Sequence, residues 1–162
     1  MNLNLVYLFQ AAGILAPSMS AGAIGYISAQ VVPLILLAPA DIGLVQFKYM
    51  YTLGKRTFPF IAIGSTVVQG CLAYWERRRS VLSSNLYIIS GTCSALIVIY
   101  ILMFMKNTNS TLLSMNPDKV LRSTDATETF RKLLNKWSMK SLFRSVLLCT
   151  SALASFAGTF LF

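Results

Sequence analysis

The stretch MNLNLVYLFQAAGILAPSMSAGAIGYISAQVVPLILLAPA, residues 1–40, contains no charged side chain. Three more uncharged stretches follow it, at residues 57–75, 80–105 and 145–162. A helix needs about 20 apolar residues, at about 1.5 Å of rise each, to cross roughly 30 Å of hydrocarbon. Each stretch reaches or approaches this length, so the sequence predicts four transmembrane helices.

We place the spans at about residues 5–30, 57–75, 82–105 and 141–161. Together with their connections they use nearly all of the 162 residues, which leaves no room for a separate soluble domain. The expected fold is therefore all-α, with residues 1–162 forming a single integral membrane domain. We predict a multi-pass four-helix transmembrane bundle.

Helical structure is also expected outside the spans, in the first loop and before the last span. Residues 40–56 mix charged and aliphatic side chains, and Gly54 and Pro59 mark a break before the next span, so we expect an interfacial helix in the first loop. Asp125 and Glu128 have the spacing of a capping box, and no Gly or Pro follows them until residue 158. About 33 helical residues give roughly 50 Å, so we predict a long final helix that projects from the membrane.

Small and polar residues indicate how the spans pack. Ala21, Gly25 and Ala29 recur at four-residue spacing, which allows close approach of a second helix. This stripe fits packing within one chain or between the copies of a homo-oligomer. Gln69 lies inside the second span and needs a hydrogen-bond partner there, so it must face the bundle.

The positive charge of the chain points to a membrane rather than to nucleic acid. The net charge is +9, and the cations flank apolar spans, where they attract anionic headgroups and orient the helices. Membrane lipids are therefore the expected partners, and Lys132, Lys136, Lys140 and Arg144 form a basic stripe that fits headgroup contact. Ten cations lie in the first and third loops against three at residues 77–79, which places both termini on the non-cytosolic side.

The composition excludes several kinds of catalytic centre. The chain has no histidine and only five carboxylates, whereas haem, di-iron and catalytic zinc sites depend on those side chains. The three cysteines fall in predicted spans and do not form a disulfide framework. Phosphate-binding loops, nucleophile elbows and intramembrane acidic pairs are also absent from the sequence. We therefore predict no resident cofactor and no metal site.

A few side chains remain as candidates for chemistry. Trp137 and Arg144 share one helical face with Ser141 and Leu148, so the indole and the guanidinium can line one pocket. Tyr51 lies three residues from Lys48 and four from Lys55, and two cations favour the phenolate that a base requires.

Gln46 could orient a phenol or quinone oxygen by hydrogen bonding. Each of these residues also has a structural interpretation. Trp137 and Tyr51 fit an interfacial aromatic belt, and Arg144 fits a side chain that extends to the headgroups. Gln46 could pair with backbone groups that a bend leaves free.

The order of four motifs resembles the anthrone oxygenase-like family of small four-helix membrane proteins. An aliphatic run between prolines, Val32-Pro33 to Ala38-Pro39, precedes Gln46-Phe47-Lys48-x-x-Tyr51-x-x-Gly54. Asn116-Pro117-x-Lys119-x-Leu121 follows in the third loop, and Trp137 and Arg144 stand seven apart in the last helix. The resemblance extends from Ala21 to Arg144. Phe47 stands where fungal members commonly have Trp, and Thr52 where some have an acid or His.

The resemblance implies oxidation of an anthrone-type polycyclic aromatic to a quinone by a monooxygenase of secondary metabolism. Dioxygen would be the co-substrate, a hydrophobic aromatic small molecule the partner, and no cofactor would be needed. We predict Tyr51, Arg144 and Lys48 as catalytic residues, and Gln46, Trp137 and Asn116 as substrate-binding residues. The alternative is a non-catalytic multi-pass membrane protein with a structural or lipid-interacting role.

Overall fold

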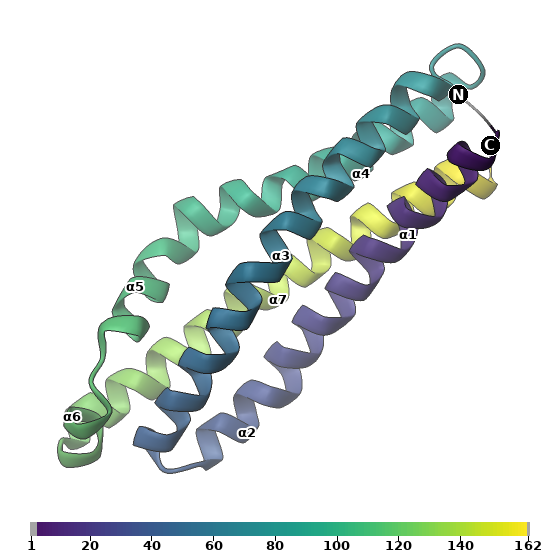
Figure 1. The fold of residues 1–162 in the computed structure, drawn as a ribbon. Coiled ribbons are helices and arrows are strands. Elements are labelled where there is room, and N and C mark those ends of the chain that lie inside the picture. Colours follow the sequence, from purple (N-terminus) through teal and green to yellow (C-terminus); the bar gives the residue numbers. More distant parts are fainter. Residues whose placement is uncertain (1–2, 162) are drawn as a thin grey trace.

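The computed structural model describes residues 3–161, which form helices joined by short turns with no strand among them. Four long rods run antiparallel, which confirms the predicted four-helix bundle (Figure 1). The first rod comprises α1 (Leu3–Tyr26), the π-helix η1 (Ile27–Val31) and α2 (Val32–Leu37), and the second is α3 (Ala40–Glu76). The third comprises α4 (Val81–Tyr100), the π-helix η2 (Ile101–Met105) and α5 (Lys106–Ser114), and the short α6 (Pro117–Arg122) leads to the fourth, α7 (Thr124–Phe160).

The distribution of side chains is that of a protein surrounded by lipid. Large apolar side chains cover the outside, among them Met19, Leu37 and Phe60, each more than 70% exposed. The interior contains many serines, which allow close approach of helices and hydrogen-bond across them. Each rod is long and apolar enough to cross a membrane. The chain is therefore a multi-pass integral membrane protein.

The first loop contains no separate interfacial helix, so that part of the prediction is wrong. The helix α3 continues without a break from Ala40 to Glu76, with Pro59 inside it. Leu44 and Phe47 near its start are completely buried, so this segment packs in the bundle and does not lie flat at the membrane surface. Membrane helices tolerate an internal proline when neighbouring groups satisfy the freed backbone.

The other rods also extend beyond the predicted spans. Helical structure continues from Leu3 to Leu37 and from Val81 to Ser114, through π-helical turns at η1 and η2. The final helix is long, as predicted, but it begins at Thr124 with Ser123 as its N-cap, whose side chain accepts a hydrogen bond from the backbone N–H of Ala126. Asp125, the first residue of the predicted capping box, is therefore the second residue of the helix instead of its cap.

Part of the small-residue stripe on α1 packs against α7. The Ser145 hydroxyl donates to the Ala21 carbonyl over 2.7 Å, and a Cβ atom at Gly25 would lie only 3.0 Å from that hydroxyl oxygen. One turn further along, Ser138 donates to the Ser28 carbonyl over 2.8 Å. Ala29 is exposed. The close-approach face is thus Ala21, Gly25 and Ser28, and it serves packing within the chain.

Polar contacts join the helices in the half of the bundle that contains the chain ends. Ser151 on α7 exchanges hydrogen bonds with Ser90 on α4 and also pairs with Ser94, at distances of 2.7 to 3.0 Å. Gln69 on α3 is completely buried and donates to the Gly13 carbonyl over 2.8 Å, as its predicted inward orientation requires.

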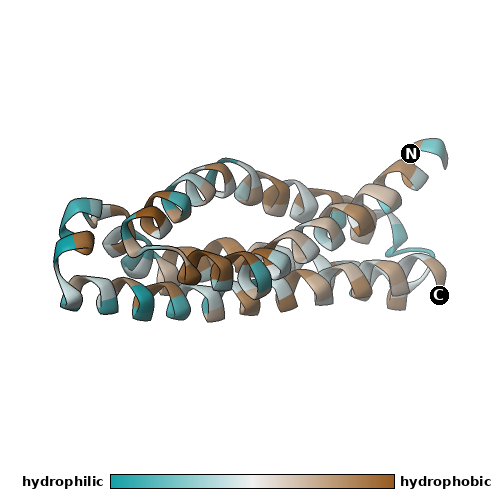
Figure 2. Cartoon of the chain, turned by 90° about the horizontal axis from the view of Figure 1, so that it is seen from below, coloured by the Kyte–Doolittle hydropathy of each residue, from teal (hydrophilic) through white to brown (hydrophobic). Residues whose placement is uncertain are grey.

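The opposite half of the bundle is more open. Figure 1 shows the start of α1 and the end of α7 beside the turn between α3 and α4, whereas α5 and α6 lie at the far end. Hydrophilic residues gather toward the two ends, with hydrophobic residues between them (Figure 2). In this half, the α5 part of the third rod packs less closely on α3 than its α4 part does. The cavities described next lie there.

Candidate functional site

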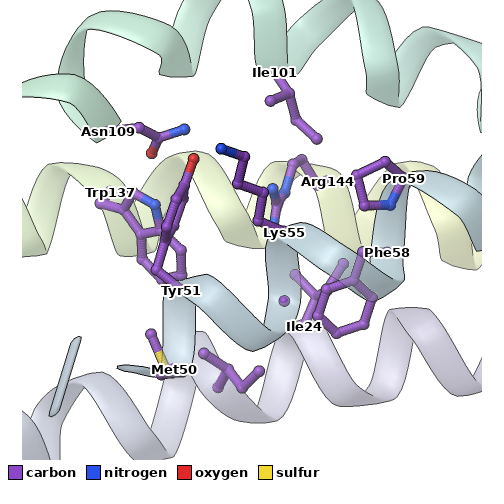
Figure 3. Close-up of a pocket in the computed structure, with 12 residues that line it drawn as sticks. Ile24, Met50, Tyr51, Lys55, Phe58, Pro59, Ile101, Asn109, Trp137 and Arg144 are labelled. Atoms are coloured by element: carbon purple, nitrogen blue, oxygen red, sulfur yellow. The ribbon is translucent and has the colours of Figure 1, made fainter. Parts of the chain in front are cut away.

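A small cavity lies where α1, α3, η2, α5 and α7 meet, and we call it the inner cavity. Its volume is about 70 Å³, and α3 supplies half of its lining from consecutive turns. The walls are mostly apolar, and the polar groups that face it are few and close together (Figure 3). Those polar residues are Tyr51, Lys55, Asn109, Trp137 and Arg144.

Arg144 supplies a buried positive charge to the inner cavity. Its residue is 9% exposed, and its Nε has no hydrogen-bond partner. Within residues 3–161 the one ion pair joins Lys132 to Glu128 at an exposed site, so no carboxylate neutralises the guanidinium. A charged side chain in a membrane bundle is costly unless it faces a polar partner or a functional cavity. The position of Arg144 therefore indicates a site for a negatively charged group.

Trp137 and Tyr51 form an aromatic wall beside Arg144. The Trp137 ring meets the Phe47 ring edge to face at 5.2 Å between centroids, and Phe47 lies 5.9 Å from the Tyr51 ring. Phe47 is completely buried, so it fixes both rings from behind. The indole Nε1 of Trp137 is buried without a partner, which leaves a hydrogen-bond donor available at the cavity.

Asn109 and Lys55 approach the same point from two other directions. Figure 3 shows the Asn109 amide next to the Tyr51 hydroxyl and the Lys55 side chain extending between Tyr51 and Arg144. Asn109 comes from α5, and its Oδ1 is buried without a partner. The inner cavity therefore combines two cations, a phenol and two hydrogen-bonding groups in apolar surroundings. Such a set can hold a flat aromatic and stabilise negative charge on one of its oxygens.

Lys140 anchors the segment that carries Asn109. Its ammonium group on α7 donates to the Phe104 carbonyl in η2 and to the Thr108 hydroxyl, the latter over 3.1 Å. A π-helical turn interrupts the regular backbone pairing, and here a cation satisfies one of the carbonyls. Within the basic stripe, Arg144 is thus buried and Lys140 pairs with η2 and α5, whereas Lys132 and Lys136 are exposed.

A larger cavity adjoins the inner cavity, and we call it the outer cleft. Its volume is about 540 Å³, and it shares Tyr51, Lys55, Pro59, Ile101 and Asn109 with the inner cavity. Its remaining lining comes from the third rod, and most of those side chains are exposed at the surface of the bundle: Val98, Leu102, Lys106, Ser110 and Leu113. The outer cleft therefore connects the inner cavity to the surroundings between α3 and the η2–α5 segment.

Three of the six predicted site residues meet at this place, namely Tyr51, Arg144 and Trp137. The other three, Gln46, Lys48 and Asn116, line neither cavity. Gln46 is exposed, because the inward face of α3 is occupied by Phe47.

Local backbone contacts account for the remaining two residues. The Lys48 ammonium donates to the Met115 carbonyl over 2.6 Å, which ties α3 to the end of α5. Asn116 is the N-cap of α6, where its side chain accepts from the Asp118 N–H over 2.9 Å. Both side chains are therefore already paired with backbone outside the site.

Asn109 and Lys55 are the cavity residues that the sequence did not single out for the site. Asn109 lies in a segment rich in Asn, Ser and Thr, and this segment is helical. The buried residues Thr108, Asn109 and Leu112 have helical spacing, and this pattern was the available signal. Lys55 was considered only as a neighbour of Tyr51, although it faces both cavities.

Groups that hold metals do not gather here. Across residues 3–161, no three His, Cys, Asp or Glu side chains come together in an arrangement that could hold a metal ion. The five carboxylates of the chain all fall in this range, and none lines the inner cavity or the outer cleft. The chemistry available at the site is thus that of cations, a phenol, an amide and an indole.

Comparison with known proteins identifies a family. The family model described as anthrone oxygenase matches residues 47–154, a segment that contains every polar residue of the inner cavity. No curated protein and no solved structure matches the chain.

Proposed function

The chain belongs to the anthrone oxygenase family, and on this basis we propose that it is a membrane monooxygenase of secondary metabolism. Its substrate would be an anthrone-type polycyclic aromatic dissolved in the bilayer, which it oxidises to a quinone with dioxygen. The observation that carries the proposal is the buried Arg144, which has no carboxylate partner in the described chain and faces an apolar cavity beside Tyr51.

The proposed reaction balances without a resident cofactor. A base removes a proton from the methylene carbon of the anthrone, and the resulting enolate transfers one electron to dioxygen. The radical pair combines through a new C–O bond to give a peroxide. Loss of the second methylene proton and cleavage of the O–O bond then yield the quinone carbonyl and one water. The substrate supplies all the electrons.

The cavity residues can stabilise the charges that develop during these reaction steps. Negative charge develops first on the enolate oxygen and then on reduced dioxygen, and the cations of Arg144 and Lys55 would stabilise both. Tyr51 would receive or relay the substrate proton, since its hydroxyl lies beside both cationic side chains (Figure 3). Asn109 and the Trp137 indole N–H would orient the oxygen substituents of the aromatic system.

The test uses membranes that contain the protein, emodin anthrone and ¹⁸O₂. We expect quinone formation faster than in empty membranes, which report the spontaneous oxidation, with one labelled oxygen in the new carbonyl. Replacement of Arg144 by Gln should lower kcat at least about tenfold, because it removes a charge needed in the transition state. Arg144→Lys should retain more activity than Arg144→Gln.

The matched control is Arg78→Gln, which removes the same charge from an exposed position in the turn between α3 and α4. Thermal unfolding of each variant would show whether it remains folded. A wild-type rate equal to the empty-membrane rate would refute the oxygenase proposal for this substrate. Equal losses in Arg144→Gln and Arg78→Gln would remove Arg144 from the mechanism.

A further inference from the structure

The outer cleft has features that the proposed chemistry does not use. We propose that it binds the non-reacting end of the substrate, and that Lys106 and Ser110 select a substrate with a carboxylate group at that end. This inference rests on the proposed function, because it assigns the part of the substrate that lies away from the reacting carbon.

Size requires a second compartment. A cavity of about 70 Å³ accommodates on the order of five water molecules, and a polycyclic aromatic is larger than that. The outer cleft, at about 540 Å³, falls within the roughly 300 to 1,000 Å³ of small-molecule sites. The two compartments share five lining residues, so one flat molecule can extend from the first into the second.

The charge of the outer cleft defines the chemical class of its ligand. Lys55 and Lys106 both line it, and neither has an ion-pair partner within residues 3–161. The rest of the lining is largely apolar, with Val98, Leu102 and Leu113 from the third rod. A ligand that matches both features has a hydrophobic body and an acidic substituent.

Lys106 and Ser110 give the acidic substituent a definite position. They stand four residues apart on α5, so their side chains share one face of the helix. An ammonium group and a hydroxyl can donate to the two oxygens of one carboxylate. Lys106 lines the outer cleft but not the inner cavity, whereas Lys55 lines both. The acidic group therefore lies at the end remote from Arg144.

Binding can be measured without turnover, by using stable product analogues. The chain has two tryptophans, and Trp75 lies outside both cavities, where it packs with Arg79. In a Trp75→Phe protein, quenching of Trp137 fluorescence reports occupancy of the cavities. The two probes are anthraquinone-2-carboxylate and anthraquinone-2-carboxamide, which have nearly the same shape and differ in charge. The protein is held in nanodiscs of uncharged phosphatidylcholine.

We expect the carboxylate to bind about tenfold tighter than the carboxamide, and Lys106→Gln to reduce this preference at least about fivefold. Lys106→Arg should keep the preference, because it keeps the charge. The control is Lys119→Gln, which removes an exposed cation at the same end of the bundle and away from the cleft. It should leave the preference unchanged, which excludes a general effect of surface charge.

The outcomes separate the two proposals. Equal affinity for the two probes, or equal loss of preference in Lys106→Gln and Lys119→Gln, would overturn the carboxylate site. If either of these results is obtained but neutral anthrones are oxidised, the oxygenase proposal stands and only this inference fails. If the Lys106-dependent preference is observed but no anthrone, acidic or neutral, is oxidised, the acid-binding site stands and the oxygenase proposal fails.

Discussion

Replacement of Lys140 by Met tests how the site is held together. The wild-type ammonium group bonds the Phe104 carbonyl in η2 and the Thr108 hydroxyl in α5, and Asn109 is the next residue. Methionine fills much of the same space but donates no hydrogen bond. The variant therefore leaves a carbonyl of the π-helical turn unpaired, and it frees the segment that presents Asn109 to the inner cavity.

The size of the effect follows from the two lost bonds. Hydrogen bonds to charged groups contribute about 1.5 to 3 kcal/mol in general, and bonds between membrane helices average about 0.6 kcal/mol with a maximum near 1.7. Lys140 is partly exposed, so we expect a local loss of about 1 to 2 kcal/mol. Opening of the η2–α5 segment should then become roughly 5 to 30 times more frequent.

Native-state hydrogen exchange, read by mass spectrometry on peptides that cover residues 101–114, measures that opening directly. The control is Lys136→Met, one turn earlier on α7, where the lysine is exposed and no hydrogen bond or ion pair involves it. Exchange should rise in Lys140→Met alone, and turnover of an anthrone should fall with it. Similar exchange in the two variants would show that Lys140 does not hold the segment.

Two further predictions concern packing and orientation. A Cβ atom added at Gly64 would meet nothing within 4 Å, so Gly64→Ala should raise the free energy of unfolding by about 0.5 to 1 kcal/mol. A Cβ atom added at Gly43 would lie 2.9 Å from the Ile35 carbonyl oxygen, so Gly43→Ala should lower the free energy of unfolding by about 1 to 3 kcal/mol. Thermal unfolding of the two variants checks this, and shifts of the same sign would contradict it. The distribution of cations predicts that a cysteine at Arg78 and a tag at the C-terminus are labelled only from the non-cytosolic side, and a cysteine at Lys119 only from the cytosolic side. Labelling of positions 78 and 119 from one side would contradict the antiparallel arrangement.

The parts of the site that the sequence predicts come from regular helical geometry. Trp137 and Arg144 stand seven residues apart in a helix without internal Gly or Pro before Gly158, so their shared face depends only on the helical repeat. Uncharged stretches of sufficient length likewise determine the four spans, because water is absent from the bilayer core and only helices satisfy the backbone there.

The parts that the sequence misses depend on contacts between distant segments. Whether Gln46 or Phe47 faces inward is set by the rotation of α3, and Trp137 fills the space next to Phe47. Lys48 is close to the site in sequence, but its partner is a carbonyl 67 residues away. The break that the sequence predicts before the second span does not occur, and α3 continues through Pro59 within the packed bundle.

Asn109 is a cavity residue that the sequence did not predict, and it too depends on contacts between distant segments. Its segment is polar, and local composition favours an irregular loop. Lys140 and Lys48 pair with backbone carbonyls just before and just after α5, at Phe104 and Met115. Those partners come from α7 and α3, so no short window of sequence around Asn109 contains them.

The packing of α1 against α7 has a consequence for how the protein is made. The hydrogen bonds from Ser138 to η1 and from Ser145 to α1 link residues 110 and 124 positions apart. At roughly 5 to 20 residues per second, the ribosome completes these positions on α7 about 5 to 25 s after their partners in the first rod. During that interval the close-approach face of the first helix has no partner from its own chain. Final assembly of the bundle therefore waits for the last helix to enter the bilayer, and a nascent chain that stops before α7 leaves the first helix without its most extensive neighbour.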